Sequence, residues 1–435
     1  MKTDFKKCKV EILDALCGTG KTHAIISWMH RNPTKRYLYV SPLLSEIEER
    51  IVPECEDLSF KYPETCEDKT KTGHLTELLR EGHNVAFTHN LYTRMTRQHM
   101  ELIEAQNYVM IIDEEVSMIE PLEASSAGNS GYTNNDLKYL YNDNKVTVDP
   151  DDFGRLIWQW EDYGSEAKYS RLKSMCDLGM VYCADYKTER KTGERIDEIH
   201  SLVTQLPVEL LSCCKRVILI SYLFKGSIMD AFLKMKGVDV VPLDKNKEGI
   251  TLRFSNEEIL EQITDLINFV KTPSTKKIGR KRLTYTYYAN DLTEEDAKEI
   301  SAAIRSVGRE CKATSDDMMW TCPKDRAFGN KKNRNYIKPK GYAANKCYVY
   351  CSARATNDYA KKHTLVHALY RHPNLTVEKY LEHYGVSIDT DNFALAELIQ
   401  WVWRSRIRNK QPINLCILST RMRILFQHWL VNTNS

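Results

Sequence analysis

Residues 14–28 read DALCGTGKTHAIISW, a glycine turn that follows an apolar run and opens a helical pattern. A turn built on Gly18 and Gly20 lets backbone N–H groups converge on phosphate oxygens at the amino end of a helix. We expect Lys21 to reach the β- and γ-phosphates and the Thr22 hydroxyl to bind Mg²⁺. The alternative is a plain glycine turn with a chance lysine. The residues expected to contact a nucleotide are Gly18, Thr19, Gly20, Lys21, Thr22 and His23.

A phosphate loop of this kind needs a carboxylate at the end of a neighbouring strand to complete its metal site. YVMIIDEEV (108–116) supplies one, because an apolar run there ends abruptly in three acids. Asp113 is placed to hold Mg²⁺, and Glu114 is placed to orient and activate an attacking water. The alternative is an acidic turn after a buried strand. Together, the two motifs predict a chain that binds and hydrolyses a nucleoside triphosphate.

The composition is typical of an ordinary globular protein: 435 residues, 42% of them hydrophobic and 28% charged. No segment approaches the roughly 20 consecutive apolar residues of a membrane span, so we expect a cytoplasmic protein without a membrane partner. The 13 cysteines include no CxxC pair, which favours reduced thiols, with an unrecognised metal site as the alternative. A basic second half beside an acidic first half indicates a polyanion partner or, alternatively, only a solvated surface bias.

Short runs rich in Val, Ile and Tyr alternate with helical periodicity, which is typical of parallel sheets covered by helices. We expect an α/β fold with two parallel-sheet domains in tandem, 1–247 and 248–435. The first carries an irregular or helical insertion at about 120–200, and the second a basic loop at 323–346. The runs expected to form strands are KVEIL (9–13), RYLYV (36–40), NVAFT (84–88), YVMII (108–112), RVILIS (216–221), VDVV (238–241), RLTYTYY (282–288), KCYVYC (346–351) and INLCIL (413–418).

A second signal for an anionic ligand lies in ELIQWVWRSRIRNK (397–410), where tryptophans and arginines alternate. Arginine stays charged and matches phosphate with two parallel donors. If the stretch is a single helix, residues four apart share a face, so Gln400, Arg404 and Arg408 line up while Arg406 points elsewhere. We expect this stripe to face the γ-phosphate held by the first domain. The alternative is a helix paired with acids of its own domain.

The order of these motifs resembles that of the superfamily 2 helicases, the class that includes the DEAD-box and DEAH-box proteins. That class tolerates alanine at the head of its phosphate loop, where Ala15 stands here. The C-terminal stretch most resembles helicases encoded by phages and related mobile elements. The stretches that resemble motifs Ia, Ib, III, V and VI are YVSPLLSEIEER (39–50), FTHNLYTRM (87–95), LISYLFKGS (219–227), CSARATNDYAK (351–361) and QWVWRSRIR (400–408).

The resemblance implies two RecA-like domains that bind ATP and Mg²⁺ between them and couple hydrolysis to movement along a nucleic-acid strand. It implies DNA as the partner, tracked along one strand that is single, forked or part of a duplex, with RNA as an alternative. Replication or recombination proteins are further candidate partners, and a phage-encoded chain would work in the host cytoplasm. The residues that match the family's strand-contacting motifs are Ser41, Thr88, His89, Arg354, Thr356 and Asn357.

The sequence also departs from the family pattern. Val116 replaces the last residue of the DEAD or DEAH box, and Ile407 stands where motif VI has its second arginine. Tyr222 and Leu223 replace the alanine and threonine of motif III, so only Ser221 is left to make the hydrogen bond of that motif. Two alternatives therefore stay open: a motor that moves on duplex DNA without separating strands, and an ATP-binding nucleic-acid clamp with weak turnover.

Overall fold

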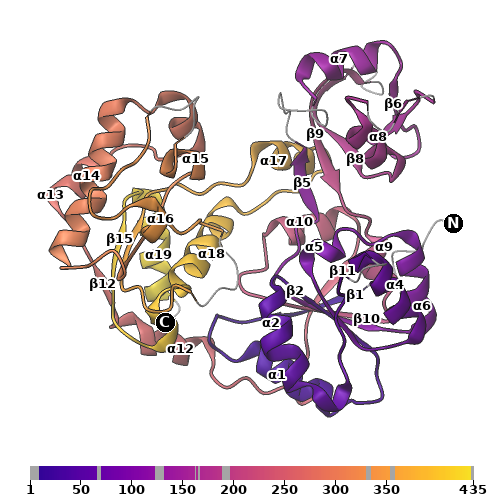
Figure 1. The fold of residues 1–435 in the computed structure, drawn as a ribbon, viewed down its shortest axis with the longest axis horizontal. Helices are drawn as coiled ribbons and strands as arrows, with labels where there is room; N and C mark the ends of the chain where they lie inside the picture. Colours follow the sequence, from indigo (N-terminus) through magenta and orange to yellow (C-terminus); the bar gives the residue numbers. More distant parts are fainter. Residues whose placement is uncertain are drawn as a thin grey trace.

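The structure of the chain, a computed structural model, describes residues 9–65, 70–122, 132–161, 163–164, 167–188, 196–329, 335–352 and 358–432. Two bodies, each built on a parallel sheet, lie side by side, and a smaller body of antiparallel strands extends from the first (Figure 1). Within these residues, no helix is long and apolar enough to cross a membrane.

The first sheet contains six parallel strands in the order β11-β1-β10-β4-β2-β3. Its register places Asp14 opposite Ser221 and Ile220 opposite Asp113, so β1, β10 and β4 end together at one edge. All the strand runs expected in the first half are found here. The strands are β1 (Lys9–Asp14), β2 (Tyr37–Ser41), β3 (Val85–Thr88), β4 (Val109–Asp113), β10 (Arg216–Ser221) and β11 (Asp239–Pro242).

Helices cover both faces of this sheet, and the strands are buried on both sides as a consequence. Successive residues of β4 alternate between the faces: Met110 and Ile112 pack into one hydrophobic cluster, and Val109 and Ile111 into another. The helices are α1 (Lys21–His30), α2 (Leu44–Glu46), η2 (Ile47–Ile51), α3 (Val52–Glu54), η3 (Glu56–Leu58), α4 (Lys71–Glu81), α5 (His89–Tyr92), α6 (Arg97–Gln106), α9 (Glu209–Ser212), α10 (Ile228–Met235) and α11 (Lys245–Glu248).

The second sheet contains four parallel strands in the order β12-β15-β14-β13. Two parallel sheets in tandem confirm the expected fold class, α/β with two RecA-like domains. The strands are β12 (Ile267–Phe269), β13 (Met318–Thr321), β14 (Thr364–His367) and β15 (Ile413–Ile417). The helices are α12 (Asn256–Thr264), α13 (Pro273–Ile278), η4 (Tyr287–Asp291), α14 (Glu294–Glu310), α15 (Lys324–Ala327), α16 (Ala344–Cys347), α17 (Leu375–His383), α18 (Thr390–Trp403), η5 (Arg406–Asn409) and α19 (Thr420–Asn432).

The strand predictions were less accurate in the second half of the chain. The run 413–418 contains β15, but 282–288 leads into the π-helix η4, and 346–351 makes only an isolated bridge between Tyr348 and Trp320. Aromatic and β-branched residues favour strands only where the surrounding structure offers a partner edge. The expected basic loop at 323–346 contains α15 and the start of α16, and its residues 330–334 lie outside the described part.

The insertion differs from the irregular or helical segment that we expected. It contains a three-stranded antiparallel sheet in the order β5-β9-β8 and a two-stranded hairpin, β6 and β7, in addition to two helices. Buried and exposed residues do not alternate regularly along β9, and its pairing with β8 has register shifts. Its elements are β5 (Ile119–Leu122), α7 (Asn134–Asn142), β6 (Val146–Val148), β7 (Leu156–Trp158), α8 (Ser170–Asp177), β8 (Val181–Thr188) and β9 (Ile196–Gln205).

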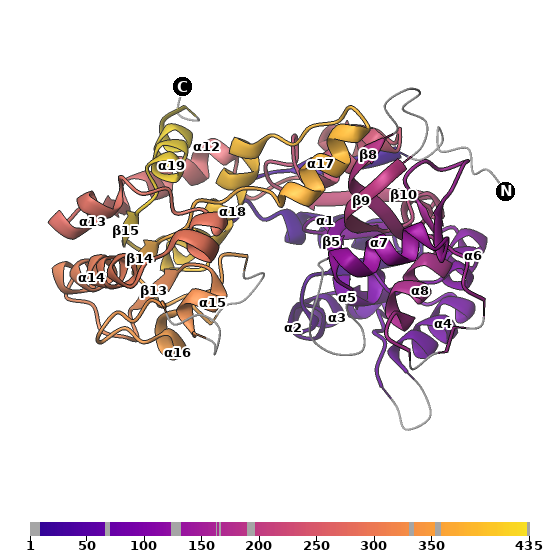
Figure 2. The same cartoon turned by 90° about the horizontal axis from the view of Figure 1, so that it is seen from above.

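One helix of the C-terminal half packs against the first domain. After β14 the chain crosses over, forms α17 beside β5, β8 and β9, and returns to the second domain through α18 (Figures 1 and 2). Val377, Tyr380 and Leu381 lie on one face of α17, and all three are buried in the hydrophobic core of the first domain. The Tyr380 hydroxyl also donates a hydrogen bond of 2.6 Å to the Gln205 side chain.

We predict that Leu381→Ala lowers the free energy of unfolding by about 2–5 kcal/mol, because the side chain is fully buried and its loss leaves a cavity. Leu375→Ala on the same helix is the matched control. Its side chain is 64% exposed, so the change should stay within about 0.5 kcal/mol. Urea unfolding of the full chain measures both. Equal effects of the two substitutions would contradict the docking of α17.

Candidate active site

The loop between β1 and α1 forms the glycine turn that the sequence predicts to bind phosphate. Gly18 and Gly20 have φ values of 88° and 87°, a conformation that residues with a Cβ rarely adopt. α1 begins at Lys21, and no side chain caps its first turn, so backbone N–H groups there point toward an anion site. The Lys21 ammonium donates to the carbonyl oxygen of Ala15, which holds it inside the same turn.

Asp113 ends β4 next to this loop. Its Oδ2 accepts hydrogen bonds from the Thr22 hydroxyl at 3.3 Å and from the Tyr39 hydroxyl at 2.7 Å. Burial raises the pKa of Asp113, and the Tyr39 hydrogen bond and the Lys21 charge oppose that shift. Thr22 and Asp113 thus converge as expected, and a hydroxyl beside a carboxylate supplies the oxygen ligands that suit Mg²⁺. Tyr39 was missed, because only the pairing of β2 with β4 shows that it reaches Asp113.

Strand β10 holds the two acids that follow Asp113. Glu114 has a φ of 62°, which is uncommon for a residue other than glycine, and its N–H donates to the Ile220 carbonyl at 3.0 Å. The Ser221 hydroxyl donates to Glu115 at 2.9 Å. Backbone strain of this kind persists where neighbouring structure enforces it, often at functional sites. Strand β10 therefore fixes the acidic run 113–115 through Ser221 and the Ile220 carbonyl group.

Glu46 and Arg50 also face this site, although the sequence analysis did not single them out. They lie four residues apart at the junction of α2 and η2, with Arg50 Nη1 3.5 Å from Glu46 Oε1. Burial raises the pKa of Glu46 to about 7, and the negative charge of Asp113 adds to the rise. Their spacing was visible in the sequence, but a solvated helix shows the same spacing. The fold alone turns this face toward Asp113.

The expected single helix over 397–410 is wrong. α18 ends at Trp403, Arg404 is its C-cap, and η5 follows from Arg406. Ser405 breaks the helix because its backbone is extended and its hydroxyl accepts from the N–H of Ile407.

The arginines nevertheless reach the site as expected. Arg404 Nη2 lies 3.8 Å from Glu114 Oε1, which is an ion pair between the two domains. Gln400 and Arg408 lie beside it, and burial together with the charge of Arg404 lowers the pKa of Arg408. Two close guanidinium groups favour a multiply charged anion between them. Arg406 points elsewhere, as expected, and its Nε donates to the carbonyl oxygen of Pro412.

These groups surround one cavity of about 530 Å³ between the domains, a size typical of small-molecule sites. The ring of Trp403 covers the glycine loop, since a Cβ on Gly18 would lie 3.3 Å from it. Thr19 and His23 do not line the cavity: Thr19 is buried, its hydroxyl donating to Leu16, and His23 is exposed. The expected residues that line it are Gly18, Gly20, Lys21, Thr22, Asp113, Glu114, Gln400, Arg404 and Arg408.

The expected strand-contacting residues differ in their placement. Ser41 has no accessible surface, so its side chain cannot meet a phosphate in this conformation. His89 is also buried, and its Nε2 lies 2.9 Å from the Asp113 carbonyl oxygen, which joins α5 to the acidic motif. Thr88 caps α5 by accepting from the N–H of Leu91. Ser41 and His89 therefore offer almost no side-chain surface to a strand in this conformation, and their role in strand contact stays a prediction. Arg354, Thr356 and Asn357 lie outside the described residues.

Comparison with known proteins shows a similarity that runs through almost the whole chain. Residues 261–430 match the family model of the YonV C-terminal Rossmann-like domain. The chain is 26% identical, over 448 residues, to the SPbeta prophage-derived uncharacterized protein YonV of Bacillus subtilis (strain 168). That similarity covers 98% of this chain and 99% of YonV.

Solved structures are more distant. An apo structure of XPD is 12% identical with a TM-score of 0.43, covering 98% of this chain and 96% of its own. S. tokodaii Xpd4 is 11% identical with a TM-score of 0.40, and the match covers 97% of this chain and 94% of Xpd4. S. cerevisiae Dbp5 bound to RNA and ADP BeF3 is 12% identical with a TM-score of 0.29, and the match covers 98% of this chain and 83% of Dbp5. At this level of similarity, none of the three indicates an activity for this chain.

We predict that Glu46→Gln raises the stability of the metal-free protein at neutral pH but not at acidic pH. The pKa of Glu46 is about 7 in the folded state, against an ordinary value of 4.5, so the protonated form stabilises the fold below pH 4.5. Wild type loses that contribution as the pH rises through 7, whereas the neutral amide keeps it. The difference in unfolding free energy should grow to about 1–3 kcal/mol by pH 8.

The measurement is denaturant unfolding between pH 4.5 and 8 without divalent cations. Glu48→Gln is the control, because Glu48 is exposed on the same helical segment. If the stabilities of wild type and Glu46→Gln stayed parallel over this range, burial and the charge of Asp113 would not raise the pKa of Glu46.

Proposed function

We propose that the chain is an ATP-dependent DNA helicase or translocase, a phage-type motor that couples ATP hydrolysis between two RecA-like domains to movement along a nucleic-acid strand. One observation carries this proposal: the glycine loop and acids of one domain and the arginines of the other line the same cavity. The ion pair between Glu114 and Arg404 supports it further, since it brings the two halves of a hydrolytic site into contact.

The residues divide the work of ATP hydrolysis by their chemistry. The backbone of Gly18–Thr22 and the Lys21 ammonium hold the triphosphate, and Thr22 and Asp113 hold Mg²⁺. When bound, Mg²⁺ neutralises phosphate charge and orients the phosphates. Glu114 accepts a hydrogen bond from the attacking water and keeps it in line, while Tyr39 holds the Asp113 carboxylate in place.

The second domain completes the site. Arg404 and Arg408 stabilise the charge that develops on the transferred phosphoryl group, and Gln400 lines the same cavity as a further polar contact. Because Arg404 sits 3.8 Å from Glu114, a small movement between the domains is enough to exchange the glutamate for a phosphate as its partner. Hydrolysis is thereby tied to the distance between the domains.

DNA is the proposed partner, with RNA as the alternative. The basic second half of the chain supports a polyanion ligand, and the prophage-derived relative supports a phage-type protein. A place in phage DNA replication in the host cytoplasm is part of the same proposal. Contact through backbone phosphates would hold a strand without reading its sequence.

One contact favours a second candidate, an ATP-binding nucleic-acid clamp with weak turnover. The Tyr222 hydroxyl accepts a buried hydrogen bond of 2.7 Å from Trp429 Nε1, and Tyr222 packs in the hydrophobic cluster of the second domain. Such a joint at motif III restrains separation of the domains. ATP binding with negligible hydrolysis in the presence of single-stranded DNA would favour the clamp, and hydrolysis without strand displacement would favour a duplex translocase.

We predict that Lys21→Ala lowers ATP hydrolysis in the presence of single-stranded DNA by about 10²–10³-fold, because a preorganised donor to the triphosphate is lost. The measurement is phosphate release with and without DNA, with circular dichroism to confirm folding. Hydrolysis that survives this change would overturn the assignment of the phosphate loop.

We predict that Arg404→Ala lowers kcat by about 10³–10⁵-fold, as expected for an arginine that meets the transferred phosphoryl group. Arg406→Ala is the matched control, since Arg406 lies two residues away and bonds the carbonyl oxygen of Pro412 outside the cavity. It should keep kcat within a few-fold of wild type. Equal loss in both variants would argue for a general effect on folding rather than for a role of Arg404 in hydrolysis.

A further inference from the structure

Helix α18 begins on the first domain, although most of it belongs to the second. The N–H of Asp389, its N-cap, donates to the Gly226 carbonyl at 2.9 Å. The Asn392 side-chain amide donates to the carbonyl oxygens of Leu223 at 3.0 Å and of Lys225 at 2.6 Å. The contact is close as well as polar, since a Cβ on Gly226 would lie 2.5 Å from the Asp389 Cβ. The first turn of α18 is thus seated on the loop that follows β10.

That loop is itself attached to the phosphate-binding strand. The Asp14 carboxylate, at the end of β1, accepts from the N–H of Leu223 at 2.9 Å and from the N–H of Phe224 at 3.1 Å. Leu223 has a φ of 58°, so these hydrogen bonds hold a strained turn. The loop occupies the place of motif III, where the sequence departs from the helicase pattern. Here it presents backbone carbonyl groups to α18.

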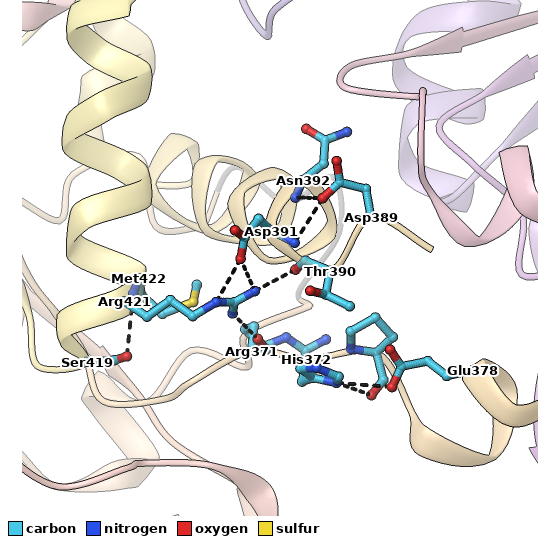
Figure 3. A network of polar contacts seen from close by, with 11 residues as sticks. Arg371, His372, Glu378, Asp389, Thr390, Asp391, Asn392, Ser419, Arg421 and Met422 are labelled. Atoms are coloured by element: carbon cyan, nitrogen blue, oxygen red, sulfur yellow. Dashed lines mark hydrogen bonds and ion pairs between the residues drawn. The ribbon is translucent and has the colours of Figure 1, made fainter. Parts of the chain in front are cut away.

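The rest of α18 is fixed to the second domain. The Arg421 guanidinium of α19 donates to Asp391 at 2.8 Å, to the Thr390 carbonyl at 2.9 Å and to the Arg371 carbonyl at 3.0 Å (Figure 3). Arg371 in turn forms a partly buried ion pair with Glu397, which lines the cavity. Figure 3 shows Asn392 and Asp389 turned toward the other side of the helix from Arg421.

The two ends of α18 therefore touch the first domain at different places. Its start sits on residues 223–226, and the residue after its end, Arg404, meets Glu114. A helix of 14 residues is about 21 Å long. With the start held in place, a rotation of about 10° moves the far end by about 4 Å. That movement is comparable to the 3.8 Å that separates Arg404 from Glu114.

We infer that the first turn of α18 is the pivot of the movement between the domains, with Asn392 as the positioning residue that fixes the arc along which Arg404 approaches the cavity. Hinges are formed by a few residues at the ends of elements that stay packed while the bodies on either side turn. This inference rests on the proposed function, since it names the part that aligns the arginine for hydrolysis.

Asn392→Asp tests the pivot. The side chains have the same shape, but a carboxylate cannot donate to the Leu223 and Lys225 carbonyl groups. An acid in the first turn also favours the helix itself, so loss of α18 does not explain an effect. We expect kcat for ATP to fall by about 5–30-fold, the cost of one or two lost hydrogen bonds, with KM changed by less than about twofold. Asn268→Ala, which removes a 2.8 Å hydrogen bond to Asn414 inside the second domain, should leave both unchanged.

Hydrogen exchange provides a readout that does not need activity. In Asn392→Asp, the amides of 223–226 and 389–392 should exchange faster than in wild type, while those of β4 should not change. Gly226→Ala disrupts the same contact from the first domain, because its Cβ would collide with Asp389. If both substitutions act through one contact, the double variant should be no slower than the slower single variant.

The outcomes separate the inference from the proposed function. Wild-type kcat and unchanged exchange in Asn392→Asp, with Lys21→Ala inactive, would overturn the pivot and leave the ATPase standing. If wild type does not hydrolyse ATP, the proposed function fails. In that case hydrogen exchange alone tests the contact between Asn392 and residues 223–226. Unchanged exchange at 223–226 in Asn392→Asp would then overturn the pivot as well. A uniform rise in exchange across the chain would also overturn it, because the effect would be on global stability.

Discussion

The parallel register of β1, β10 and β4 is the constraint on which the rest of the site depends. Because Asp14 pairs with Ser221 and Ile220 with Asp113, three strands end at one level of one edge. The glycine loop, the acidic motif and the loop that seats α18 all start from that edge. A shift of one residue in any of these pairings would turn the terminal side chains to the opposite face and separate the groups that now surround the cavity.

The charges at this edge balance one another only across the two domains. Asp113 and Glu46 are largely buried acids, and burial raises the pKa of each, which means that the fold bears a cost for keeping them ionised. Lys21 and Arg50 from the first domain and Arg404 from the second reduce that cost. A site assembled in this way is sensitive to domain separation, because removing the second domain leaves excess negative charge. The charge balance of the cavity therefore depends on the position of the second domain.

Much of the fold and of the site could be predicted because it is local in the sequence. The runs around 9–13 and 108–112 are apolar enough to mark buried strands, and the glycine loop and the acids follow them directly. Tyr39 and Glu46 could not be found in this way, since each reaches Asp113 only through strand order or helix direction. Asn392 gave no signal at all, because its partners are backbone carbonyl groups, which every residue possesses. The antiparallel sheet of the insertion was missed because β5 pairs with the distant β9 and because β8 and β9 mix polar with apolar residues.

The sequence by itself determined the α/β class, the turn at Gly18 and Gly20 and the position of Asp113, because φ preference and burial periodicity are properties of short segments. The tertiary structure decided where the arginines point. The stretch from 397 to 410 breaks after Trp403, and its side chains reach the cavity from two elements instead of one. It also decided that α17 leaves its own half of the chain to pack on the other. The direction of the arginines and the packing of α17 depend on contacts between residues that are distant in sequence. A local sequence pattern shows neither the entropy cost of forming such contacts nor the stabilisation that they provide.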